Sequence, residues 1–147
     1  MQHVTDPFAH AESTANRWLA VVRERLAAEA RYPAYRMVRA WLHVVRDRLT
    51  VGAAMDFAAQ LPELLRGVYY EGWTPSHVPT RYEVPGFIAR FAGSADIPRS
   101  EVPAVAAAVT SALGELCAPG QLEHVLKPLP DALVELLTAD GGTRRAG

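Results

Sequence analysis

One stretch of this chain occurs twice, and the repetition constrains the fold more than any other feature. A shift of 68 residues places Gly52 on Gly120 and the Leu61-Pro62 step on Leu129-Pro130. Apolar residues match at the same shift, Leu65 with Leu133 and Val68 with Leu136. Repeated units stack so that each covers the hydrophobic face of its neighbour. The repeat therefore predicts two similar halves, neither of which buries its hydrophobic face alone.

The spacing of apolar residues predicts two long helices at the start of each half. In the first half, Ser13 or Thr14 caps a helix that runs to about Glu29. Pro33 opens a second helix at its first position, and Gly52 ends it by adopting a positive φ. The apolar stripes are Trp18, Leu19, Val22 and Leu26 in the first helix, and Met37, Val38, Trp41, Leu42, Val45 and Leu49 in the second. Outside the second stripe fall Arg39, His43, Arg46 and Asp47.

The Leu-Pro step predicts that each half ends in two short helices rather than one long one. The second copy carries both Pro128 and Pro130, which remove two backbone donors and push the preceding residues out of the α region. By the repeat, residues 53–59 and 62–70 form two short helices, with Pro62 at the first position of the second. Segments 120–127 and 130–138 are their equivalents in the second half.

The second half opens with Phe87, Ile88 and Phe91, which match Trp18, Leu19 and Val22 at a shift of 69. Ser100 caps its long helix, with Pro103 tolerated in the first turn. We expect a flexible arm at 1–12, helical repeats at 13–70 and 84–138, a Gly/Pro-containing linker at 71–83 and a flexible tail at 139–147. Because no segment alternates apolar and polar residues, the fold class is all-α, a helical bundle of two pseudo-symmetric repeats in one globular domain.

Composition indicates a soluble, cytoplasmic protein. The single Cys117 cannot form an internal disulfide, the first residues lack the pattern of a signal peptide, and the longest uncharged stretch is too short to span a bilayer. The net charge of −1 conceals an asymmetry. Eight arginines oppose three acids between residues 17 and 48, whereas Lys127 alone opposes six acids between residues 100 and 140. Either the arginines decorate solvated helix faces, or the asymmetry binds an anionic partner or pairs the halves.

Three short patterns carry a resemblance to a known family. They are Leu49-x-x-Gly52, Gln60-Leu61-Pro62 and Tyr69-Tyr70-Glu71-Gly72-Trp73-x-Pro75. With them, residues 15–137 resemble the bacterial family catalogued as domain of unknown function 2267. The chain has Ala53 and Gln121 where that family often has an acidic residue after the glycine. The resemblance implies a small helical protein with two similar halves, and it implies no activity, cofactor or catalytic residue.

No catalytic, metal or cofactor motif is present in the sequence. His43 and Asp47 are spaced to share a metal ion, but two ligands are too few for a closed site, and neighbouring arginines repel a cation. A surface hydrogen bond or ion pair is the simpler interpretation. Cys117 falls on an inward position and is expected to fill the core rather than to react. Gln60 is expected to satisfy backbone groups that the Leu-Pro break leaves without helical partners.

Aromatic residues gather around the linker, and two interpretations fit them. Tyr69, Tyr70, Trp73 and Tyr82 form either a ligand or protein-docking surface, or a staple in which Trp73 covers the seam between the halves. The possible partner-binding residues are Tyr70, Trp73, Tyr82, Arg66 and Arg81. We expect a non-enzymatic protein-interaction or regulatory module that binds a partner or copies of itself.

Two other classes of function stay open at this point. A small-molecule binder or enzyme would use a cleft between the two halves, lined by convergent polar residues. Nonspecific nucleic-acid binding would use the Arg-rich face of residues 17–48, although no helix-turn-helix pattern accompanies those arginines. No cofactor and no metal ion are expected for this protein.

Overall fold

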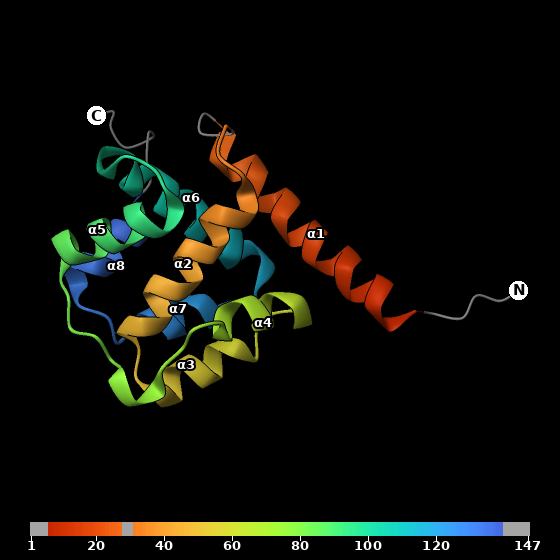
Figure 1. The fold of residues 1–147 in the computed structure, drawn as a ribbon, viewed down its shortest axis with the longest axis horizontal. Helices are drawn as coiled ribbons and strands as arrows, with labels where there is room; N and C mark the ends of the chain where they lie inside the picture. Colours follow the sequence, from red (N-terminus) through yellow and green to blue (C-terminus); the bar gives the residue numbers. More distant parts are fainter. Residues whose placement is uncertain (1–5, 28–30, 140–147) are drawn as a thin grey trace, which may run out of the picture.

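A computed structural model describes residues 6–27 and 31–139, and within these ranges the chain is helical with no strand (Figure 1). The α-helices are α1 Pro7–Leu26, α2 Ala34–Arg48, α3 Val51–Ala58, α4 Glu63–Tyr70, α5 Val84–Ala95, α6 Val102–Leu116, α7 Gln121–Leu126 and α8 Asp131–Thr138. Short 3-10 turns lie at η2 Pro75–His77 and η3 Arg99–Glu101. Over the same ranges, no helix combines the length and hydrophobicity that crossing a bilayer requires. The predicted all-α fold is confirmed.

The two halves use the same order of helices and share most of their helix contacts. Each half has two longer helices followed by two short ones. Helices α1, α2 and α4 correspond in order to α5, α6 and α8. Helix α1 packs on α6, and correspondingly α5 packs on α2. Helix α4 contacts α1 and α2, and correspondingly α8 contacts α5 and α6. Helix α2 also contacts α6, and α3 contacts α7, so two contacts join equivalent helices (Figure 1). A duplicated unit would produce this pattern, and the duplication itself stays a prediction.

One apolar core runs through both halves. Its large, fully buried side chains come from either half and include Trp41, Phe57, Tyr69, Phe87 and Phe91. The indole Nε1 of Trp41 donates a 2.9 Å hydrogen bond to Oγ1 of Thr110 on α6, and both side chains are buried. A polar bond at the centre of the core therefore ties the halves together.

The Leu-Pro steps break the chain as predicted. Helix α3 ends at Ala58 and α4 begins at Glu63, with Pro62 at the extended position immediately before α4. Pro130 takes the same place before α8. Each proline is the cap residue and not the first helical residue that was predicted for Pro62. Its ψ angle, 160° at Pro62 and 145° at Pro130, is extended rather than helical.

The N-terminal boundary differs from the prediction. Helix α1 begins at Pro7, where residues 1–12 were expected to form a flexible arm and Ser13 or Thr14 to cap the helix. Asp6 caps it instead, because its side chain accepts a 2.9 Å hydrogen bond from the amide of Phe8, and Pro7 suits the first turn. Residues 1–5 and 140–147 lie outside the described ranges, and so do most of the expected tail and the start of the expected arm.

Three further local predictions are corrected. Gly52 lies inside α3 and has no positive φ, whereas its equivalent Gly120 precedes α7 with φ +80°. Pro33 is the cap residue before α2 rather than its first helical residue. Ser100 lies within the η3 turn, and α6 begins at Val102 without a side-chain cap. Glycine and serine each occur at several positions near helix ends, so their presence alone does not determine the residue at which a helix begins or ends.

Candidate functional site

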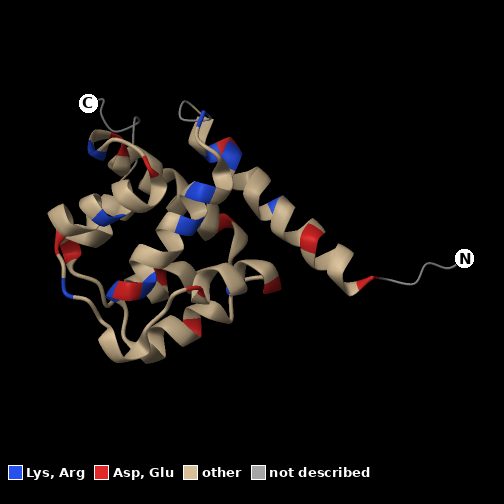
Figure 2. Ribbon diagram, in the orientation of Figure 1, with Lys and Arg blue, Asp and Glu red and all other residues tan. Residues whose placement is uncertain are grey.

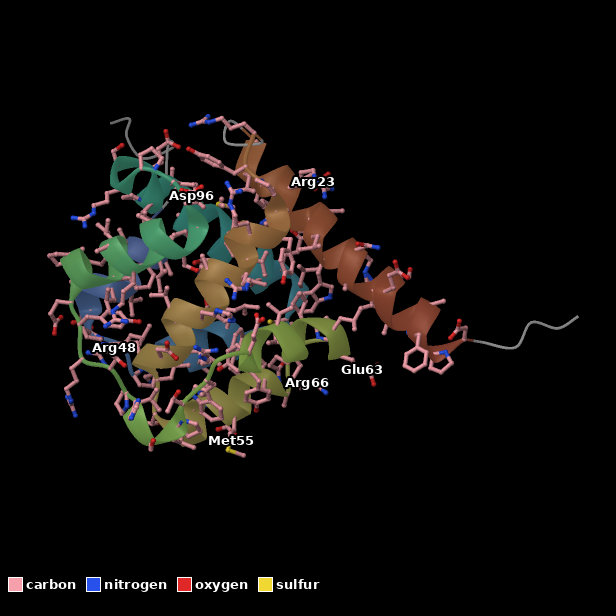
Figure 3. All side chains as sticks on the ribbon, in the orientation of Figure 1. Arg23, Arg48, Met55, Glu63, Arg66 and Asp96 are labelled. Carbon is pink, nitrogen blue, oxygen red and sulfur yellow. The ribbon has the colours of Figure 1, made fainter. Side chains whose placement is uncertain are left out.

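Two of the predicted partner-binding residues support the structure rather than forming a surface. Tyr82 is buried, its hydroxyl donates to the carbonyl of Val44, and burial raises the pKa of Tyr82. Arg66 donates to the carbonyls of Ala58 and Leu61, at 3.1 and 2.7 Å, and so closes the break between α3 and α4 (Figure 3). The sequence assigned this task to Gln60, but the longer Arg66 reaches these carbonyls from the next helix.

Tyr70 and Trp73 form a half-buried stack on the linker. The rings of Tyr69 and Tyr70, and those of Tyr70 and Trp73, have centroids 5.3 Å apart in each pair. Within the described part of the chain, the indole Nε1 of Trp73 is buried and finds no hydrogen-bond acceptor. Arg81 is exposed. The five residues therefore differ in exposure, Trp73 packs on Tyr70 of the first half, and a staple over the seam between the halves stays a prediction.

Neither His43 nor Cys117 has the surroundings of a reactive site. His43 Nε2 donates a 2.7 Å hydrogen bond to the carbonyl of Val68, while Asp47 accepts from Arg46, so the two side chains are engaged separately. Burial lowers the pKa of His43 and raises the pKa of the Cys117 thiol. Cys117 is buried, which confirms its predicted core position. Over residues 6–27 and 31–139, no cluster of three or more potential metal ligands occurs.

The first half contains a buried arginine that the helical pattern placed outside the apolar stripe. Arg46 has 3% of its surface exposed. Its Nη1 donates to the backbone carbonyls of Tyr69 and Glu71, at 2.7 and 2.8 Å, and its Nε donates to Asp47 at 2.7 Å. The two carbonyls lie at the C-terminal end of α4, where a positive charge is favoured by the helix dipole. The interpretation that these arginines decorate solvated faces is wrong for Arg46.

Other large side chains of the first half fill the space around Arg46. Arg39 Nε pairs with Glu71 at 3.1 Å, and the Tyr69 hydroxyl donates to the carbonyl of Ala54 at 2.8 Å. His43 covers the carbonyl of Val68 beside them. We call Arg39, His43, Arg46, Tyr69 and Glu71 the first-half arginine site.

The second half has a groove instead. It has a volume of about 470 Å³ and lies between α6, α7 and α8. Its lining consists of Ala107, Thr110, Ser111, Gly114, Gly120, Leu122, Glu123, Leu126, Leu137, Thr138 and Ala139. We call this the α6–α8 groove.

The lining of the α6–α8 groove corresponds in sequence to the first-half arginine site. At the shift of 68, Gly114 replaces Arg46. The remaining pairs in the same order are Ala107 for Arg39, Ser111 for His43, Leu137 for Tyr69 and Ala139 for Glu71. All five replacements line the groove, and four of the five are small residues. At all five positions the first half therefore carries a larger, polar side chain than the residue that lines the groove.

Charged residues lie on two sides of the groove. Glu123 is exposed and belongs to the lining. From α1, Arg25 Nη1 donates to Ser111 Oγ at 2.6 Å, and the same guanidinium forms an ion pair with Glu115. The positive charge of Arg25 is thus matched by Glu115, and Glu123 supplies a further negative charge at the groove.

A smaller hollow lies where the halves meet. It has a volume of about 230 Å³ between α3 and α7. Asp56 and His124, which are equivalent at the shift of 68, both line it, together with Lys127, Ala53, Val125 and Pro128. We call it the α3–α7 hollow. It brings polar residues of both halves together.

Comparison with known proteins identifies a family and no activity. Residues 15–136 match the model of the family described as "Uncharacterized conserved protein (DUF2267)". No curated protein matches the chain. The predicted resemblance is confirmed, and the family description leaves the function to be inferred from the chain's own surface.

Proposed function

We propose that this chain, which belongs to the DUF2267 family, is a non-enzymatic protein-interaction or regulatory module that holds its partner in the α6–α8 groove. The observation that supports the proposal is the groove itself, about 470 Å³ in volume. That volume is typical of ligand-binding clefts, which lie between about 300 and 1,000 Å³. In the case of self-association, the partner held in the groove is a second copy of this chain.

The lining of the groove suits recognition better than chemistry. Leu122, Leu126 and Leu137 supply apolar surface, whereas Ser111, Glu123 and Thr138 supply polar groups. Such a mixed lining is typical of sites that orient a partner by a few polar contacts on an apolar floor. The groove is open at exposed Gly114 and Gly120, so a segment of another chain has access.

A substitution at Gly114 tests the proposal, because this residue is exposed in the groove and lies on α6. Gly114→Trp places a bulky uncharged side chain in the groove, and Gly114→Ala is the matched control. In cells of the source organism, we expect the wild type and Gly114→Ala to co-purify with the same partner and Gly114→Trp to lose it. Equal recovery with all three proteins, each verified as folded by circular dichroism, would contradict binding in the groove.

The α3–α7 hollow favours a second candidate, a small-molecule binder. Asp56, His124 and Lys127 give it opposite charges within about 230 Å³, which is the seam of convergent polar residues that this class predicts. A metabolite screen by thermal shift is expected to give a stabilising ligand whose effect Asp56→Asn weakens and Asp131→Asn, at an exposed residue of α8 outside the hollow, does not. A ligand whose effect survives Asp56→Asn would argue against this site.

A further inference from the structure

We infer that the α6–α8 groove binds an arginine side chain of the partner protein, in the position that Arg46 fills in the first half. This inference rests on the proposed function and specifies the chemistry of the partner. It starts from a comparison inside one chain: one copy of the repeat contains a bound guanidinium group, and the other copy contains the corresponding open space.

The first half shows which backbone groups hold the guanidinium. Arg46 reaches the carbonyls of Tyr69 and Glu71, at 2.7 and 2.8 Å, where α4 ends. Their equivalents are Leu137 and Ala139, which lie where α8 ends and line the groove. The last four carbonyls of a helix have no intrahelical partner, and the helix dipole makes that end attractive to a cation. The end of α8 therefore has the corresponding carbonyls: Leu137 is buried, and Ala139, which is half-buried, is the acceptor that a guanidinium reaches from the groove.

The space matches the same ligand. Gly114 contributes no side chain where Arg46 stands in the first half, and Leu137 lacks the hydroxyl by which Tyr69 reaches Ala54. The groove of about 470 Å³ has room for more than one arginine side chain, so neighbouring residues of a partner also fit. A segment of polypeptide is thus a better occupant than a free amino acid.

Charge also favours a cation in the groove. Glu123 lines it. The segment from residue 100 to residue 140 contains six acidic residues and one basic residue, Lys127. The nearby Arg25 is already paired with Glu115. A planar guanidinium donates to two acceptors at once, as Arg46 does, whereas an ammonium is a compact, strongly hydrated charge. We therefore expect arginine to be preferred over lysine.

The test compares three full-length proteins: the wild type, Gly114→Ala and Gly114→Arg. A Cβ at position 114 meets Leu122 Cδ2 at 3.6 Å, an ordinary contact, so both variants are expected to fold. Gly114→Arg restores to the second half the residue type that the first half has. The probes are N-acetyl-arginine methylamide, its lysine counterpart and its neutral citrulline counterpart, each titrated into ¹⁵N-labelled protein by NMR.

We expect saturable shifts for the amides of residues 114, 122–123 and 137–139 in the wild type and in Gly114→Ala, with a dissociation constant of about 1 mM for arginine. Lysine and citrulline are expected to bind at least about fivefold more weakly. Glu123→Gln should weaken arginine binding about threefold. In Gly114→Arg the built-in side chain occupies the groove, and arginine binding should fall by about tenfold or more.

Several outcomes would overturn the inference. One is the absence of saturable shifts in the wild type, and another is arginine binding that Gly114→Arg leaves unchanged. Arginine binding that appears only in a variant with Arg144→Ala and Arg145→Ala would identify the chain's own C-terminal segment as the occupant. Loss of partner capture in Gly114→Trp without any arginine binding would refute the inference and leave the proposed function standing. Arginine binding with capture unaffected by Gly114→Trp would refute the proposed function.

Discussion

The two halves of the molecule share most of their helix contacts, yet they carry different side chains at corresponding positions. Around α2 and α4, Arg46 and its neighbours occupy the space between the helices and bind backbone carbonyls. Around α6 and α8, Gly114, Ala107 and Ser111 leave a groove of about 470 Å³. Helix packing alone therefore does not decide whether a half is closed. The difference lies in the volume and polarity of three side chains, which are Arg39, His43 and Arg46 on α2 and Ala107, Ser111 and Gly114 on α6.

This difference divides the molecule into a half whose buried arginine is paired internally and a half with an open groove, which is the proposed site. Arginines recur along α1 and α2 (blue in Figure 2), but several are committed to the chain's own backbone. Arg36 donates to Ala95, Arg48 to Tyr82, and Arg46 to two carbonyls. The Arg-rich half is thus less available to an anionic partner than its sequence suggests.

The largest expected effect comes from emptying the first-half arginine site. Arg46→Ala leaves the carbonyls of Tyr69 and Glu71 without their donor and leaves Asp47 without its partner. Breaking such a buried, charged network costs about 3 kcal/mol or more in the free energy of unfolding. Urea denaturation followed by circular dichroism measures this loss.

Arg48→Ala is the control for that measurement. Arg48 is half-buried and donates to the single carbonyl of Tyr82 at 3.0 Å, so its loss should cost about 1 kcal/mol. Equal effects of the two substitutions would mean that the first-half arginine site is no more important than an ordinary side-chain hydrogen bond.

The bond between the halves is the next test. Thr110→Val removes the acceptor of the buried Trp41 indole N–H and keeps the shape of the side chain. An unpaired buried donor costs about 2 kcal/mol. Thr138→Val is the matched control, because Thr138 is exposed and its hydroxyl donates to the carbonyl of Val134 within its own helix. If both variants unfold at the same urea concentration, Thr110 does not tie the halves together.

Equivalent glycines should respond in opposite directions. Gly120 has φ +80°, so Gly120→Ala should lower the free energy of unfolding by about 1 kcal/mol. Gly52 lies inside α3 with ordinary backbone angles, so Gly52→Ala should raise it by up to about 1 kcal/mol. An added Cβ meets nothing within 4 Å at either position, which makes backbone conformation the only difference. Thermal unfolding of the two variants supplies the comparison, and changes of the same sign would contradict it.

The smallest expected effect is on the pH dependence of stability. Burial lowers the pKa of His43 below its usual value of about 6.5, so the folded protein binds this proton less readily than the unfolded chain. The contribution of neutral His43 to the free energy of unfolding is complete above pH 6.5, and it is lost as the pH falls through the lowered pKa of His43. The free energy of unfolding should therefore decline more between pH 7.5 and 5 in the wild type than in His43→Gln. Parallel declines would show that His43 does not contribute.

Much of the fold is readable from the sequence, because helical periodicity and proline breaks are local signals. The repeat made the break before Pro62 visible, since its second copy contains two prolines. The start of α1 was missed, because apolar periodicity begins later than the Asp6 cap and Pro7. The sequence predicted Tyr82 as a possible surface residue because nothing local indicates that a tyrosine in a linker is buried. Its hydrogen-bond partner is the carbonyl of Val44, which is distant in the sequence.

The candidate site was missed for a different reason. Periodicity ranks residues by polarity, so it assigned Arg46 to solvent and gave Gly114 no role. The burial of Arg46 depends on the ends of another helix, which no local pattern describes. A signal did exist: at the shift of 68, Arg39, His43 and Arg46 all have small equivalents. Comparing side-chain volumes between the copies, rather than matching their apolar residues, would have indicated the groove.

The guanidinium-to-carbonyl bonds have a consequence for which basic residue this chain tolerates. At Arg36, Arg46, Arg48 and Arg66 a permanently protonated donor meets a neutral oxygen, so acidification removes neither partner. The chain has fourteen arginines and one lysine. A sequence with lysine at those four positions would carry the same net charge and an almost unchanged isoelectric point, yet it would lack the planar donors that fasten these helices to backbone carbonyls elsewhere in the chain.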